Sequence, residues 1–339
     1  MEDCAAGEAG SGKPLAGKAA ARSPMEKGMG VKMNRYYPEG HLIDTPRNQN
    51  SLRTAGGLAE AALEGRVLEA RAVLCDAEHN LYVDLPCMEG IIPYYEGAIG
   101  IAEGTTRDIA LISRVSKPVC FTVQGFEDTA DGGRRAVLSR RAAQEKCRAE
   151  YIAALRCGDV IPARVTRLES FGAFCDIGCG LPALMPIASL SVSRISHPSD
   201  RFCTGMDILG VVSSLEGGRV CLSQRELLGT WEENAALFAQ GETVAGIVRS
   251  VEAYGVFVEL TPNLAGLAEP REGVIPGQQA GVYIKSILPE KMKLKLVIID
   301  TSDAAPEHAP LRYFISGGHI GRWVYSPADC GKIIASEFD

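Results

Sequence analysis

The strongest constraint on the fold is an internal repeat in the middle of the chain. Residues 158–184 align without gaps with residues 241–267, 83 positions later, and seven of the 27 aligned residues are identical. The aligned copies share a glycine with an aromatic residue on either side, in the stretches Phe171–Phe174 and Tyr254–Phe257. Because a repeat of this length marks one structural unit, the repeat decides the domain organisation.

A third copy is recognisable upstream. Residues 65–71 match residues 158–164 at an offset of 93, and residues 81–85 fall on residues 173–177 when a slip of one residue is allowed. Residues 135–141 match residues 219–225, and the last copy closes early, at residues 293–296. The sequence therefore predicts three units, which agrees with the two or three domains expected of 339 residues.

Each copy is predicted to consist of short strands. In the middle copy, residues 160–168, 171–177, 207–215 and 219–223 are strand-like, and Gly217-Gly218 forms a turn. Short strands without a long helix favour a small closed barrel, because closure leaves no exposed edge strand. Apolar residues at helical spacing in 139–155 and 227–238 predict one short helix between successive barrels.

The predicted fold is therefore all-β, with three tandem five-stranded barrels joined by short helices, a disordered N-terminus and a C-terminal β-hairpin. We place a disordered or extended segment at 1–57, barrels at 58–141, 158–225 and 241–300, linker helices at 142–157 and 226–240, and a hairpin tail at 301–339. Residues 41–56 are expected to be extended and residues 57–63 helical. The tail hairpin is expected to turn at Gly317-Gly318.

Composition excludes several classes of protein. Hydrophobic residues make up 46% and charged residues 23%, as in soluble globular proteins. No stretch approaches 18 apolar residues and the N-terminus lacks a secretion signal, so we expect no membrane partner and a cytoplasmic location. Eleven cysteines without a CxxC pair favour reduced thiols over disulfides or a metal site. The net charge of −7, with no basic block, disfavours tight duplex binding.

Residues 158–178 and the ending Arg219-x-x-Leu-Ser-x-Arg225 resemble the S1-type RNA-binding domain, an OB-fold barrel. The resemblance covers about residues 65–300, and the tandem arrangement is similar to the S1 family of bacterial ribosomal proteins. It implies a role in translation, with single-stranded mRNA and the small ribosomal subunit as partners and no cofactor or small-molecule substrate. Two alternatives stay open: an RNA-binding accessory of an RNA-degrading enzyme, and a protein-interaction scaffold with weakened RNA affinity.

The predicted RNA site combines aromatic rings, on which bases stack, with basic side chains that contact phosphates. Phe171 and Phe174 would lie on opposite faces of a flat strand unless Gly172 kinks it, whereas the family implies that both rings reach the binding face. The basic candidates could equally be ordinary surface charges. The candidates are Phe171, Phe174, Arg164, Arg167 and Arg219 in the second copy, Tyr254, Phe257, Arg249, Lys293 and Lys295 in the third, and His79, Tyr82 and Arg135 in the first.

Other features favour binding without catalysis. A histidine that the family carries in its third strand is replaced by Pro93, Pro186 and Glu269 in the three copies, which predicts lower RNA affinity. The histidines form no metal or catalytic motif, so no metal and no enzymatic activity are expected. Asp176 and Glu259 are expected to be solvated turn residues. The tail aromatics either extend the RNA surface or pack against the third barrel: Tyr313, Phe314, Trp323 and Tyr325.

Overall fold

The computed structural model describes residues 36–130, 132–303 and 311–338. The disorder predicted for the N-terminus falls on residues 1–35, which lie outside the described residues. The extended chain expected over residues 41–56 is wrong for helix α1 (Pro46–Leu52). The Thr45 side chain accepts a hydrogen bond from the Asn48 amide, and Pro46 takes the first helical position, which proline favours. Helix α2 (Ala55–Leu63) follows.

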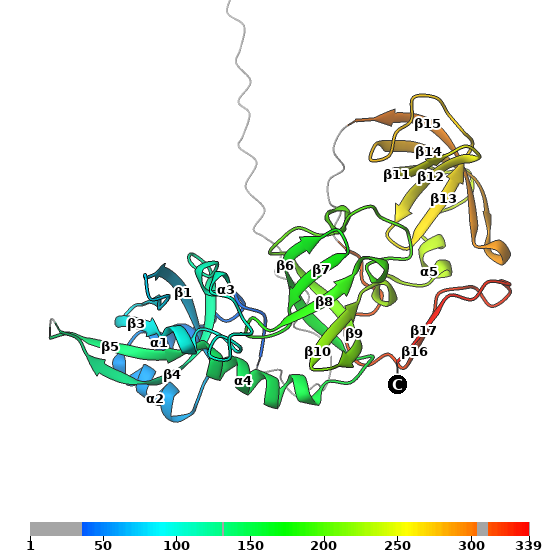
Figure 1. The fold of residues 1–339 in the computed structure, drawn as a ribbon. Helices are drawn as coiled ribbons and strands as arrows, with labels where there is room; N and C mark the ends of the chain where they lie inside the picture. The colour runs from blue at the N-terminus through cyan, green and yellow to red at the C-terminus, as the bar shows by residue number, and fades with distance from the viewer. Residues whose placement is uncertain (1–35, 131, 304–310, 339) are drawn as a thin grey trace, which may run out of the picture. The chain divides into compact units, whose positions relative to one another are not determined.

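Three closed five-stranded barrels then follow one another along the chain, as the repeat predicts (Figure 1). In each barrel the first strand pairs with the second and fourth, and the third strand runs parallel to the fifth. Barrel 1 consists of β1 (Leu68–Cys75), β2 (Leu81–Leu85), β3 (Met88–Ile92), β4 (Pro118–Asp128) and β5 (Arg134–Ser139). Barrel 2 consists of β6 (Val160–Glu169), β7 (Gly172–Asp176), β8 (Pro182–Pro186), β9 (Asp207–Glu216) and β10 (Arg219–Ser223). Barrel 3 consists of β11 (Thr243–Glu252), β12 (Gly255–Thr261), β13 (Leu264–Ala268), β14 (Gln279–Leu288) and β15 (Lys293–Ser302).

Alternating side chains fill the barrel interiors. Along β6, Ile161, Ala163 and Val165 are buried while their neighbours are more exposed, as expected of a strand with one face on the core. Cys175 on β7 lies in the same core and behaves as a small apolar residue. All ten cysteines in the described part of the chain are free.

Short helices join the barrels. Helix α4 (Arg140–Glu150) follows β5 directly, because the last strand residue, Ser139, accepts a hydrogen bond from the Ala142 amide and caps the helix. Helix α5 (Trp231–Ala235) lies between barrels 2 and 3 and begins with a capping box formed by Thr230 and Glu233. The remaining helices are α3 (Ile109–Ile112) and the 3₁₀ turns η1 (Tyr94–Glu96), η2 (Ile152–Ala154), η3 (Ile187–Ser189), η4 (Pro198–Asp200), η5 (Arg225–Leu228) and η6 (Pro289–Lys291).

The tail contains the predicted hairpin, but in a different place. Its strands are β16 (Arg322–Val324) and β17 (Ala335–Glu337), so the expected turn at Gly317-Gly318 is wrong. The Gly318 carbonyl instead accepts a hydrogen bond from the Val160 amide at 3.0 Å, and His319 forms a β-bridge with Asp159. Gly318 and the β-bridge at His319 therefore supply hydrogen-bond partners to the backbone at the start of β6. The local sequence of the tail does not predict this pairing.

Candidate nucleic-acid interface

The aromatic pair of barrel 2 lies together on the outer surface. Phe171 belongs to the turn before β7, so strand alternation does not apply to it, and its ring meets Phe174 edge-on with 6.0 Å between centroids. The Phe171 side chain is 53% exposed. Gly172 allows β7 to approach β8, because a Cβ atom there would lie 2.4 Å from the Met185 carbonyl oxygen. The structure thus brings both rings to one face without a kinked strand.

A row of outward side chains extends this pair across the barrel. Phe174 pairs in register with Arg167 on β6 and with Leu184 on β8, and Leu184 pairs with Cys221 on β10. Each of these four residues is at least partly exposed, whereas the residues on either side of Phe174, Leu184 and Cys221 are buried. Barrel 2 therefore presents a flat apolar strip bordered by the Arg167 guanidinium. Arg167 forms an ion pair with Glu169 but stays well exposed, so its guanidinium is accessible.

Barrel 3 repeats the arrangement. Tyr254 and Phe257 meet edge-on at 6.1 Å, and Tyr254 is 66% exposed. Phe257 pairs with Leu267, which pairs with Lys295, so the exposed ammonium group of Lys295 ends the row. Gly255 has the role of Gly172, since a Cβ atom there would lie 2.5 Å from the Ala268 carbonyl oxygen. We call the pairs Phe171–Phe174 and Tyr254–Phe257 the two aromatic platforms.

Barrel 1 does not form such a platform. His79 has a positive φ of 64° and its ring lies against Tyr94, at 5.8 Å, while Tyr82 occupies the strand position that Phe174 has in barrel 2. Arg135 forms an ion pair with Glu127 and pairs in register with Glu89. In the first copy the His79 ring therefore lies against Tyr94, and Arg135 is accompanied by acidic side chains.

Four further basic candidates differ in their surroundings: two are exposed and two are paired within the fold. Arg219 and Lys293, at the starts of β10 and β15, are exposed. Arg164 forms two hydrogen bonds to Asp207, at 2.7 and 2.9 Å, and a third to the Glu39 carbonyl oxygen. Arg249 is only 11% exposed and is paired with acidic residues. In this structure the guanidinium groups of Arg164 and Arg249 are thus engaged in contacts within the fold.

Comparison with known proteins finds relatives among bacterial ribosomal proteins. No family model matches the chain. Over 252 residues, 69% of its length, it is 32% identical to small ribosomal subunit protein bS1 of Leuconostoc lactis, covering 56% of that protein. The chain is similar to bacterial bS1. It is also 29% identical over 231 residues to bS1 of Streptococcus pneumoniae, covering 62% of the chain and 57% of that protein. The chain thus spans about half the length of the bS1 proteins it matches.

Solved structures give only distant matches. A Streptococcus pneumoniae multidomain protein with nucleic acid binding domains aligns over 70% of this chain and 74% of its own, with 14% identity and a TM-score of 0.24. GSP13 of Bacillus subtilis aligns over 21% of this chain and 56% of its own, with 23% identity and a TM-score of 0.20. The assignment of S1-type barrels therefore rests on the bS1 similarity and on the three closed barrels themselves.

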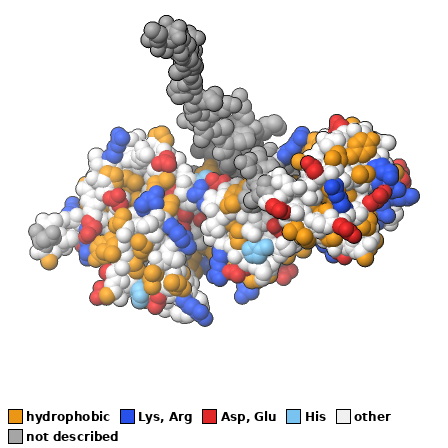
Figure 2. All heavy atoms as spheres, turned by 90° about the horizontal axis from the view of Figure 1, so that it is seen from above, with side chains coloured by type: hydrophobic (Ala, Val, Ile, Leu, Met, Phe, Trp, Pro, Cys, Tyr) orange, Lys and Arg blue, Asp and Glu red, His pale blue; other side chains and the backbone are white. Residues whose placement is uncertain are grey.

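The S1-type barrels here depart from the family pattern at the third-strand histidine. Pro186 and Glu269 take this position in barrels 2 and 3. Glu269 is exposed and lies 3.5 Å from the Lys285 ammonium group, an ion pair that screens its charge only in part. Figure 2 shows basic side chains interspersed with acidic ones, as the absence of a basic block in the sequence predicts. Local contacts therefore have to carry any attraction for RNA.

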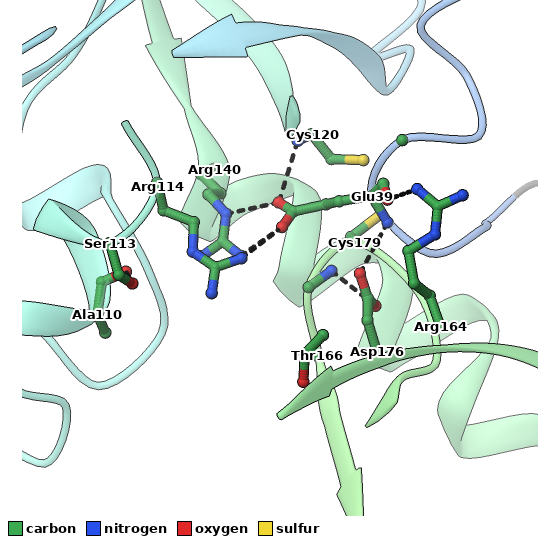
Figure 3. Close-up of polar contacts among 12 residues, drawn as sticks. Glu39, Ala110, Ser113, Arg114, Cys120, Arg140, Arg164, Thr166, Asp176 and Cys179 are labelled. Carbon is green, nitrogen blue, oxygen red and sulfur yellow. Dashed lines mark hydrogen bonds and ion pairs between the residues drawn. The ribbon is translucent and has the colours of Figure 1, made fainter. Parts of the chain in front are cut away.

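Sequence reasoning missed a buried ionic network beside barrel 2 (Figure 3). Glu39 is buried and accepts hydrogen bonds from Arg140, at 2.7 and 3.1 Å, and from Arg114 at 3.1 Å. Burial raises the pKa of Glu39, but the two guanidinium groups outweigh it and hold the pKa below its usual range. The Glu39 amide donates to Asp176 at 2.7 Å. No local sequence motif predicts this network, because its members are far apart in the sequence.

The expectation that Asp176 and Glu259 are solvated turn residues is wrong. They are 4% and 5% exposed. Asp176 accepts hydrogen bonds from the amides of Gly178 and Gly180, at 2.8 and 3.0 Å, besides that of Glu39. Glu259 is held by two arginines, of which Arg249 lies 3.0 Å away. Both carboxylates are buried because each has several polar partners, among them Glu39 for Asp176 and Arg201 for Glu259, which come from distant segments.

Among residues 36–130, 132–303 and 311–338, no three His, Cys, Asp or Glu side chains are arranged to hold a metal ion. The neighbouring thiols of Cys120 and Cys147 favour the thiolate form of Cys179 and lower its pKa to about 5. No helix in the described part of the chain is long and apolar enough to cross a membrane.

The tail aromatics pack against the fold rather than extend the platforms. Trp323 and Tyr325 are buried and belong to the apolar core of barrel 3. The Tyr313 hydroxyl accepts hydrogen bonds from the Leu209 amide and the Gln224 side chain, at 3.1 and 2.9 Å. The Phe314 amide donates to the Leu227 carbonyl oxygen at 2.8 Å. The structure thus favours the packing alternative for the tail.

Proposed function

We propose that this chain is an RNA-binding protein of translation that holds single-stranded mRNA on the aromatic platforms of barrels 2 and 3. The observation that carries the proposal is the repetition of one edge-on ring pair, at 6.0 and 6.1 Å, on the outer face of both barrels. In each pair the first ring is more than half exposed, so a base can stack on it. Stacking accepts any base and contributes about 1–3 kcal/mol per base.

The charges of the platforms favour unpaired RNA over a duplex. Arg167 and Lys295 each end an apolar row. Duplex binding needs many phosphate contacts, whereas one or two cations beside stacked bases suffice for a single strand. The net charge of −7 also excludes a general attraction to nucleic acid.

We further propose the small ribosomal subunit as partner and the cytoplasm as location. Support comes from the similarity to bS1, which is by name a protein of the small ribosomal subunit. The role is one of binding rather than catalysis. Co-sedimentation with ribosomal subunits tests this part: enrichment in the small-subunit fraction is expected. Co-purification with an RNA-degrading enzyme, without ribosomal subunits, would favour the accessory role.

Fluorescence anisotropy with a labelled oligouridylate of 20 nucleotides tests the RNA site. We expect binding that weakens with salt and falls at least tenfold in Phe171→Ala/Tyr254→Ala, since a stacking contact contributes about 1–3 kcal/mol. The matched control is Tyr95→Ala, which removes an exposed aromatic ring that lies outside the platforms. Absence of binding at micromolar wild-type protein would refute the function, and binding unaffected by the double substitution would refute the site.

A further inference from the structure

We infer that barrels 2 and 3 form one composite RNA-binding unit, in which a buried junction holds the two aromatic platforms in fixed register. We assign Arg201 and Asn263 as its positioning residues. The inference rests on the proposed function and adds an explanation of how the two aromatic platforms cooperate in binding one RNA. The barrel 2–3 junction is defined here as Arg201, Arg249, Glu259 and Asn263, with the backbone groups that they contact.

The first component of the junction is a buried ion cluster. Arg201, which follows η4 in barrel 2, is 5% exposed and its Nη2 atom lies 2.5 Å from Oε2 of Glu259 on β12 of barrel 3. Arg249 on β11 approaches the same carboxylate at 3.0 Å and also reaches Asp200 of barrel 2 at 3.4 Å. Two cations and two anions from the two barrels thus neutralise one another, with Arg201 and Glu259 buried. Such a cluster fixes geometry, because a displaced partner would leave a buried charge unpaired.

The second component is the fully buried side chain of Asn263, in the turn between β12 and β13. Its Oδ1 atom accepts a hydrogen bond from the Val192 amide of barrel 2 at 2.9 Å. Its Nδ2 group donates to the carbonyl oxygens of Arg225 and Gly229, at 2.7 and 2.8 Å, in the segment between the barrels. Next to it, the Ser193 amide donates to the Pro262 carbonyl oxygen at 3.1 Å. One side chain therefore binds three backbone groups that precede barrel 3 in the sequence.

The third component is a shared apolar core. One continuous cluster of buried residues contains Val211 of barrel 2, Trp231 of the linker helix, the interior of barrel 3, and Trp323 and Phe338 of the tail. The Tyr325 hydroxyl donates to the Asn263 carbonyl oxygen at 2.5 Å, so the tail also contacts the turn that carries the positioning residue. A connection with this much buried contact does not behave as a flexible linker.

A fixed junction changes how a long RNA binds. Once one platform holds a strand, the second platform meets it at an effective concentration set by the geometry of the junction, not by a flexible chain. An RNA that reaches both platforms then gains affinity that a short RNA cannot have. Loosening the junction should lower that gain and leave each platform intact.

The test compares oligouridylates of 6 and 20 nucleotides by anisotropy on the full chain. One OB barrel covers about 4–16 nucleotides, so the shorter RNA serves a single platform. The double substitution Arg201→Met/Glu259→Leu keeps the net charge and replaces the buried pair by apolar side chains, a change often tolerated by folds. Arg249 loses Glu259 but keeps Asp200 as an ion-pair partner at 3.4 Å. We expect unchanged 6-mer affinity and about a tenfold loss of the 20-mer advantage. Asn263→Ala is the second variant, with the same expectation.

Amide hydrogen exchange supplies a readout independent of RNA. In Asn263→Ala the Val192 and Ser193 amides should lose protection, which shows that the junction has opened. The matched control Arg47→Met/Glu64→Leu removes an exposed ion pair outside the junction and should change neither measurement. A 20-mer advantage that persists while these amides exchange freely would overturn the composite unit alone. Failure of the wild type to bind either RNA would refute the proposed function itself, and the composite unit with it.

Discussion

Asp176 in barrel 2 and Glu259 in barrel 3 occupy the same repeat position, and both carboxylates are buried against a segment from outside their barrel. Asp176 accepts the amide hydrogen of Glu39, whereas Glu259 receives the guanidinium of Arg201. The repeat thus uses one position for assembly in both barrels, although the chemical partners differ. Their burial also separates them from the platforms, which lie on the outer face of the sheet.

The ion pair between Glu39 and Arg140 should be costly to break. Both side chains are buried, so Arg140→Met leaves the Glu39 carboxylate in the interior with Arg114 as its remaining cation, at a cost of up to about 3–5 kcal/mol. Urea denaturation would measure the loss. Arg322→Met removes an exposed partner of Glu337 and should change stability by less than about 1 kcal/mol. Equal losses in the two variants would show that the buried network contributes nothing specific.

Gly172 should not tolerate a side chain. Gly172→Ala places a methyl group 2.4 Å from the Met185 carbonyl oxygen, and strand β7 would have to move away from β8. Overpacking of this kind costs about 1–3 kcal/mol. Gly125→Ala is the matched control, because a Cβ atom at this strand glycine would have no neighbour within 4 Å, and the variant should be neutral or slightly stabilised. Thermal denaturation of both variants measures the difference, and a neutral Gly172→Ala variant would contradict the close approach of the two strands.

The two exposed cations at the ends of the platform rows should contribute to the salt dependence of RNA binding. Each phosphate contact to a single strand adds about 0.7 to the slope of log K against log salt. Arg167→Met and Lys295→Met should therefore each reduce the slope by about that amount. Lys117→Met, an exposed lysine of barrel 1, serves as control. If it reduces the slope as much as the platform variants do, the phosphate contacts are not localised at the platforms.

Glu69 should make stability depend on pH. Its side chain is buried, which raises its pKa from an ordinary value near 4.5 to about 7, although the amides of Gly40, Leu42 and Ile43 donate hydrogen bonds to it. The folded chain thus binds this proton more tightly than the unfolded chain. Its contribution to stability is complete below about pH 4.5 and is lost as the pH rises through 7. The negative charge of Glu39 raises the Glu69 pKa further. The Cys120 thiol donates a hydrogen bond to the Glu69 carboxylate at 3.8 Å.

Thermal denaturation between about pH 5 and 8 would measure this effect. The melting temperature of Glu69→Gln should vary less over this range than that of the wild type, since the titrating group is gone. Glu60→Gln, at an exposed position of α2, should keep the wild-type dependence. A Glu69→Gln curve parallel to the wild type would assign the pH dependence to other groups.

Much of the fold could be predicted because the internal repeat defines the three barrels and their strands. Phe174 and Phe257 recur at one spacing, and the strands around them follow the alternation of apolar residues. The helix at Pro46–Leu52 was missed because its apolar content is low, and its start depends on the cap at Thr45. Arg164 and Arg249 could not be distinguished from Arg167, since their partners Asp207 and Asp200 come from loops and strands far along the chain. The sequence pattern therefore predicts where the aromatic rings lie better than it separates exposed arginines from arginines that are paired within the fold.

The shared core of barrel 3 and the tail has a consequence for unfolding. Three repeats suggest three independent transitions, yet Val211, Trp231 and Phe338 close a single apolar cluster. Barrel 3 excised at the linker would lose part of its own interior. Calorimetry should therefore show barrels 2 and 3 unfolding in one transition. The repeated sequence unit is a single barrel, whereas the cooperative unfolding unit contains two barrels and the tail.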